Sequence, residues 1–123
     1  MTLIFNPVKD GPAKVFRDYQ EEAMKYVWER KQEGTISREV WENVNDRLID
    51  KTISRASIIN FLYSMVDEGV LSYEERTGRG GYHGVYRPAQ CENEFKVFMA
   101  SMVISSLMRD FPEETMAVIK ECL

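Results

Sequence analysis

Residues 54–86 constrain the fold more than any other part of this chain. Ser54 stands where a helix N-cap belongs, and Gly69 stands where the helix would end. Between them, apolar residues recur at the spacing of one helical face: Ile58, Ile59, Leu62, Met65 and Val66. A strand is predicted from Val70, and the glycines at 78, 80 and 81 supply a turn before β-like alternation resumes up to Tyr86. Pro88 ends the pairing, so a helix followed by a hairpin is expected.

Two further helices are predicted before this stretch. The first covers about residues 17–32 and ends at Gly34, with an apolar stripe formed by Tyr19, Ala23, Tyr26 and Val27 and adjoined by Trp28. Thr35 and Ile36 suit a minimal strand, and Ser37 caps a second helix whose apolar face is Val40, Trp41, Val44 and Leu48. Two helices, a short turn and a hairpin follow one another in the order of a winged helix-turn-helix. The fold class expected is therefore α+β and mostly helical.

The two ends of the chain differ from this central domain. Residues 1–15 hold two prolines and a glycine and are expected to form an extended arm, whereas residues 16–90 form the winged-helix domain. Residues 91–123 form a helical tail with a last helix starting near Pro112. The tail is apolar over much of its circumference and must be buried by something. The residues expected to carry dimerisation are Phe95, Phe98, Met99, Met102, Val103 and Leu107.

Composition agrees with one soluble domain of 123 residues. No segment resembles a signal peptide or a membrane span, so a cytoplasmic location and no membrane partner are expected. Cys91 and Cys122 are too far apart for a metal-ligand spacing and are expected to be reduced thiols. The net charge of −4 argues against a nucleic-acid partner, but residues 91–123 hold three basic and six acidic side chains. The first 90 residues therefore carry a net charge of only −1.

The third helix presents a polar outer face that suits the DNA major groove. Arg55 suits guanine or a phosphate, Asn60 suits adenine, and two serines suit short contacts to bases or phosphate oxygens. The residues expected on this surface are Arg55, Ser57, Asn60, Tyr63 and Ser64, with Lys51 holding the DNA backbone beside the helix start. A merely solvated polar face is the alternative interpretation.

The hairpin tip, TGRGGYHG, is a composition that lets a cation follow a phosphate backbone or enter a narrow minor groove. Arg79 lies at the tip, with His83 close behind and Arg76 beside it, and all three are expected to contact DNA. A solvent-exposed hairpin that only improves solubility is the alternative. His83 is the only histidine, so no histidine-based metal site is expected.

Motifs for catalysis are lacking: there is no glycine-rich phosphate loop, no paired histidines and no serine elbow. We therefore expect no enzyme activity and no cofactor. Trp28 and Trp41 lie on or beside apolar stripes, where core packing is favoured over ligand stacking.

The run from Asp18 to Pro88 resembles the DNA-binding domain of the penicillinase-repressor and copper-operon-repressor regulators. The resemblance is carried by EEAMKYVWER in the first helix, by SIINFLYSMVDEGVL in the third helix and by YRP at the end of the wing. It implies a homodimeric repressor that binds a double-stranded operator of dyad symmetry, with one recognition helix per half-site and a helical tail as the dimer interface. The tail has no cysteine pair for copper and no Asn-Phe cleavage site, so the inducer chemistry of those proteins does not transfer.

Two other functions remain open from the sequence. A winged helix can instead serve as a protein-protein interaction module, for which the acidic surface is no obstacle. An effector-binding sensor is a further alternative, but the sequence names no small-molecule or protein effector.

Overall fold

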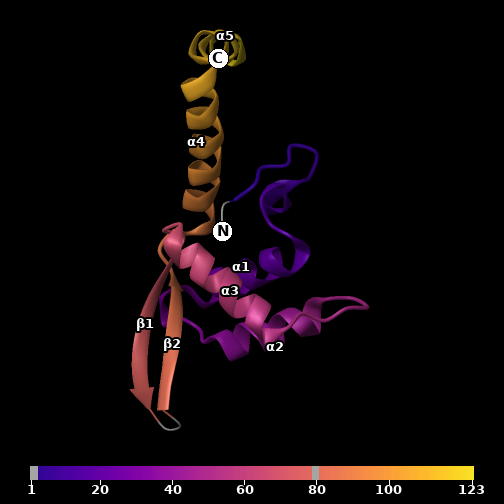
Figure 1. Ribbon diagram of the computed structural model, residues 1–123, viewed down its shortest axis with the longest axis vertical. Coiled ribbons are helices and arrows are strands. Elements are labelled where there is room, and N and C mark those ends of the chain that lie inside the picture. Colours follow the sequence, from indigo (N-terminus) through magenta and orange to yellow (C-terminus); the bar gives the residue numbers. More distant parts are fainter. Residues whose placement is uncertain (1–2, 79–80) are drawn as a thin grey trace. The chain divides into compact units, whose positions relative to one another are not determined.

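The computed structural model describes the backbone of residues 3–78 and 81–123 and the side chains of residues 3–78 and 84–123 (Figure 1). The chain divides into two compact units, residues 1–91 and residues 92–123. The described residues contain five α-helices and one two-stranded antiparallel sheet and are 64% helical. The predicted fold class, a mostly helical α+β winged helix, is confirmed.

Three helices form the body of the first unit: α1 (Asp18–Arg30), α2 (Ser37–Arg47) and α3 (Arg55–Asp67). The first helix is shorter than predicted, because Lys31 takes a positive φ of 52° and the chain continues as a 3-10 turn, η2 (Lys31–Glu33). The core is formed by side chains that all three helices contribute, every one of them fully buried: Ala23, Met24, Val27, Val40, Val44, Ile58, Leu62 and Met65. Burial of a Leu or Met side chain contributes roughly 1.5–3 kcal/mol, so this cluster holds the helices together.

A β-hairpin follows α3 and projects away from the helices (Figure 1). Its strands, β1 (Leu71–Gly78) and β2 (Gly81–Pro88), pair in an unbroken antiparallel register from Leu71 opposite Pro88 to Gly78 opposite Gly81. Thr35 adds an isolated bridge to Tyr86, donating and accepting one backbone hydrogen bond of 3.0 and 2.8 Å. The hairpin is thus the wing, and its base is tied to the segment before α2.

The first residues fold back on themselves, which differs from the extended arm that the sequence predicts. Pro12 lies in the first turn of a short 3-10 helix, η1 (Gly11–Lys14), and the Asn6 N–H donates to the Lys14 carbonyl at 2.6 Å. The Lys14 ammonium also donates to the carbonyls of Pro7 and Lys9. Phe16 then enters the core, edge-on to Phe61 of α3 with 5.6 Å between ring centroids. Hydrogen bonds of Asn6 and Lys14 close this arm, and sequence periodicity does not predict such bonds.

The second unit consists of α4 (Glu92–Asp110) and α5 (Pro112–Cys122). Figure 1 shows α5 end-on across the far end of α4, so the two helices cross steeply. Pro112 starts α5 as predicted, since proline is pre-organised for the first turn of a helix.

Candidate nucleic-acid interface

The third helix is held in place at both ends by local signals. The Ser54 hydroxyl accepts a hydrogen bond of 3.1 Å from the Ser57 N–H, as expected of an N-cap. Gly69 takes a φ of 80° just beyond the last turn. One face of α3 carries the buried side chains of Ile58, Phe61, Leu62 and Met65. The opposite face is therefore free to meet a ligand.

The exposed stripe of α3 consists of Ala56, Asn60, Tyr63 and Asp67, at the spacing i, i+4, i+7 and i+11. Arg55 is exposed beside it and makes no ion pair with the residues that the structure describes. Asn60 and Arg55, two of the expected base-reading residues, therefore present their side chains to solvent. Ala56 also belongs to this exposed stripe and was not predicted, although its position four residues before Asn60 places it on the same helical face.

Ser57 and Ser64 are only half-exposed, and their hydroxyls already have partners. The Ser57 hydroxyl lies 2.9 Å from the Ser54 hydroxyl, and the Ser64 hydroxyl donates to the Asn60 carbonyl at 2.9 Å. A serine hydroxyl still has acceptor capacity when it donates one bond. The Ser64 hydroxyl is thus placed to accept a hydrogen bond more readily than to donate one, whereas in the Ser54–Ser57 pair either hydroxyl can be the donor.

The segment before α3 is fixed by side chains of α2. The indole N–H of Trp41 donates to the Ile53 carbonyl at 2.9 Å, and Asn45 both donates to that carbonyl and accepts from the Ile53 N–H at 2.8 Å. Trp41 was predicted to pack in the core; it is half-buried and also orients the entry to α3. Asn45 went unnoticed in the sequence, because its partner is non-local.

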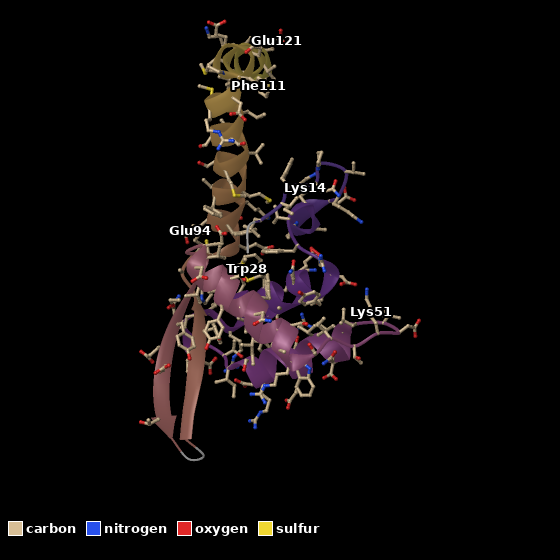
Figure 2. The ribbon with its side chains drawn as sticks, in the orientation of Figure 1. Lys14, Trp28, Lys51, Glu94, Phe111 and Glu121 are labelled. Atoms are coloured by element: carbon tan, nitrogen blue, oxygen red, sulfur yellow. The ribbon has the colours of Figure 1, made fainter. Side chains whose placement is uncertain are left out.

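Lys51 lies on the protruding loop between α2 and α3, where Figure 2 labels it. Its ammonium forms an ion pair with the Asp18 carboxylate at the start of α1. This hydrogen bond holds the pKa of Asp18 below its usual value. Both side chains are about half exposed, so solvent screens this ion pair.

In the wing, Arg76 donates to the Glu74 carboxylate at 2.6 Å. Arg87 lies 3.6 Å from the same carboxylate and donates to the Gln32 carbonyl at 2.9 Å. The hydrogen bond from Arg76 is the main reason why the pKa of Glu74 is lowered. Arg79 lies outside the described residues, as does the His83 side chain, whose backbone pairs opposite Arg76. The basic residues of the described wing are therefore partly neutralised by one acid.

In the tail, the six residues expected at a dimer interface differ in exposure. Phe95 and Met99 are buried within a single chain, Phe98, Met102 and Val103 are half-buried, and Leu107 is 42% exposed. An apolar groove of about 360 Å³ lies between α4 and α5, lined by Ile104, Leu107, Phe111, Glu114, Thr115, Val118 and Ile119. Figure 2 shows Phe111 at the junction of the two helices. Phe111 and Val118 were not predicted, because the crossing of α4 and α5 brings them together.

Within the described part of the chain, no cluster of three or more potential metal ligands forms. None of the described helices combines the length and hydropathy that crossing a bilayer requires.

A family model described as Penicillinase repressor matches residues 17–122. The chain belongs to this family. The penicillinase repressor family is one of DNA-binding transcriptional regulators, and the helices and wing described above fit its winged helix-turn-helix architecture. The predicted resemblance is thereby confirmed. Comparison of the chain with curated proteins gives no match. The folded arm, residues 3–16, precedes the part that matches the family.

Proposed function

We propose that this protein is a homodimeric repressor that binds an operator of dyad symmetry, with α3 of each protomer in the major groove. The observation that carries the proposal is the exposed stripe of α3 beside the wing, in a chain of a repressor family. An α-helix fits the major groove, and each base pair displays a distinct pattern of donors and acceptors there.

Arg55 and Asn60 supply the two most specific contacts of this proposal. The guanidinium of Arg55 matches the acceptor pair of guanine, and the amide of Asn60 matches the donor and acceptor of adenine. Arg55 has no ion pair to break within the described residues, so its binding to DNA costs little internal electrostatic energy. Tyr63, Ser57 and Ser64 complete the surface with hydrogen-bonding groups near the same groove.

Phosphate contacts come from Lys51 beside the helix start and from the wing residues Arg76, Arg79 and His83. Lys51 and Arg76 already have acidic partners, so they exchange one anion for another on binding. Each phosphate contact releases counterions, which makes the affinity fall with salt. A weakly basic surface of this kind predicts binding at low salt that weakens as salt is added, with a slope set by the small number of phosphates contacted.

The tail supplies the dimer. Apolar side chains of α4 and α5 remain exposed, among them Val97 at 70%, Phe111 at 56% and Val118 at 58%. A second copy would cover them and fix the distance between two recognition helices. The half-sites are then expected to lie one helical turn, or a multiple of it, apart.

The experiment is selection of bound sequences from a random pool of short duplexes, at low and moderate salt. The expected result is enrichment of a dyad-symmetric sequence. Arg55→Ala is expected to weaken binding of that sequence by about 1–3 kcal/mol and to relax specificity at one position of each half-site. Lys25→Ala, which removes an equal charge from the exposed surface of α1, is the control and should leave the preferred sequence unchanged. Absence of binding even at low salt would favour the protein-interaction alternative.

A further inference from the structure

We propose that Tyr63, Tyr73 and Tyr86 act as positioning residues that set the angle of the wing against the recognition helix, with Gly84 providing the space that they need. This inference rests on the proposed DNA binding. The three rings would hold α3 in the DNA major groove and, at the same time, the wing on the flanking DNA backbone.

The three rings come from three different elements. Tyr63 lies on α3, Tyr73 on β1 and Tyr86 on β2. The Tyr63 ring lies 5.6 Å from the Tyr73 ring and 6.1 Å from the Tyr86 ring, and both contacts are edge-on. The Tyr73 and Tyr86 rings are 5.1 Å apart and belong to directly paired strand positions. Each such pair stabilises an arrangement beyond simple area burial.

Tyr86 ties the cluster to the helical body. Its side chain is 2% exposed, and its backbone forms both hydrogen bonds of the bridge to Thr35. Burial raises the pKa of Tyr86, and hydrogen bonding to Tyr63 raises the pKa of Tyr73 to about 12. The phenols of Tyr73 and Tyr86 therefore stay neutral at physiological pH and keep their hydrogen-bonding protons.

Gly84 is the residue that admits the Tyr73 ring. A Cβ added at Gly84 would lie 2.5 Å from both Cζ and Oη of Tyr73, and closer still to Cε2. Gly84 is not among the glycines with positive φ, so its backbone conformation accepts alanine. The collision would be with the far end of a side chain. Gly84→Ala is therefore expected to displace the ring and leave the strand pairing intact.

Tyr63 retains an exposed fraction of 46%, so its packing in the cluster leaves part of the side chain accessible to the groove. A displaced Tyr73 would release one side of Tyr63 and free the wing from α3. Base contacts by Arg55 and Asn60 would survive, whereas simultaneous contacts by the wing would be lost. The effect should thus appear at the outer edges of each half-site.

The test uses the full-length protein and the operator duplex obtained by selection, with Gly84→Ala, Tyr73→Ala, Tyr73→Phe and the double variant Gly84→Ala, Tyr73→Ala. Affinity and hydroxyl-radical footprints are measured on the operator, and thermal unfolding is followed for each variant. Gly84→Ala and Tyr73→Ala are expected to lose at least about tenfold in affinity, which corresponds to about 1.4 kcal/mol. They should also lose protection at the half-site edges.

Two controls separate positioning from general destabilisation. Tyr73→Phe keeps the ring and is expected to restore the wild-type footprint with less than about fivefold loss of affinity, which corresponds to about 1 kcal/mol, the net worth of one hydrogen bond. In the Tyr73→Ala background, Gly84→Ala should cost almost nothing further, because the ring with which it collides is gone.

Wild-type footprints and affinities in both Gly84→Ala and Tyr73→Ala would overturn the inference while leaving the proposed function in place. Additive losses in the double variant would also overturn it, because the two residues would then act independently. Failure of the wild-type protein to enrich any operator would instead overturn the proposed function.

Discussion

The helical core of the first unit and the far end of the second unit differ in how well their apolar side chains are buried. In the first unit, side chains such as Val27, Val44 and Leu62 are fully buried by neighbouring helices. In the second unit, Phe111 and Val118 remain more than half exposed on a pair of helices. Large exposed apolar surfaces mark interaction sites. The contrast supports the proposal that the tail meets a second chain, because its exposed apolar side chains lie close together on α4 and α5.

The largest effect is expected from the matched pair Leu62→Ala and Leu107→Ala. Leu62 is fully buried, so its truncation should lower the free energy of unfolding of the first unit by about 2–5 kcal/mol. Leu107 is 42% exposed, and its truncation should leave that unit unchanged. Both tryptophans lie in residues 1–91, so urea unfolding followed by tryptophan fluorescence reports on this unit. Equal losses from the two variants would contradict the contrast.

The next effect concerns association. Phe111→Asp places a charge beside the apolar groove of α4 and α5 and should raise the dimer dissociation constant at least about 100-fold, or about 2.7 kcal/mol. Sedimentation equilibrium over a range of concentrations measures it. Val8→Asp introduces the same acid at another exposed apolar position, in the arm, and should leave association unchanged. A dimer that tolerates Phe111→Asp would remove the tail from the interface.

A smaller effect is expected at the start of the recognition helix. Ser54→Ala removes the acceptor of the Ser57 N–H and should lower the free energy of unfolding by about 1 kcal/mol. Ser72→Ala is a suitable control, because that hydroxyl only reaches the Arg87 carbonyl at 3.5 Å. Denaturant unfolding of both variants makes the comparison, and a Ser54→Ala variant as stable as the wild type would show that the cap is not used.

The smallest effect is expected from the ion pair of Asp18 with Lys51. The pKa of Asp18 is lowered in the folded state, so the pair stabilises the fold above the ordinary value of 3.8 and loses this contribution as the pH falls below it. Because both side chains are about half exposed, Asp18→Asn should cost less than about 1 kcal/mol at pH 7 and nothing near pH 2. Urea unfolding at the two pH values measures the difference, and an equal cost at both would assign the effect to something other than charge.

Local signals explain which parts of the fold the sequence predicts well. Ser54, Gly69 and Pro112 act on the backbone within a few residues, so the ends of α3 and the start of α5 follow from the sequence. The end of the folded arm packs Phe16 against Phe61 of α3, and the ion pair joins Asp18 of α1 to Lys51 of the loop between α2 and α3. Contacts between segments far apart in the chain produce no periodic pattern in the sequence, so they cannot be predicted from it.

In the candidate interface, too, some residues can be predicted from the sequence and others depend on contacts between distant segments. The exposure of Arg55 and Asn60 can be predicted from helical periodicity, because both residues lie outside the apolar face of the helix. The ring cluster of Tyr63 requires the hairpin register and the approach of α3 to the wing, neither of which the spacing of tyrosines reveals. Phe111 likewise joins the apolar groove only because α5 crosses α4.

The most direct test of the account is the number of chains bound to one selected operator, measured by native mass spectrometry, together with the affinity for a duplex in which one half-site is scrambled. We predict two chains per intact operator and a loss of at least about 100-fold in affinity on scrambling, equivalent to about 2.7 kcal/mol. A single chain that binds one half-site with full affinity would contradict the account, because the tail would then have no part in recognition.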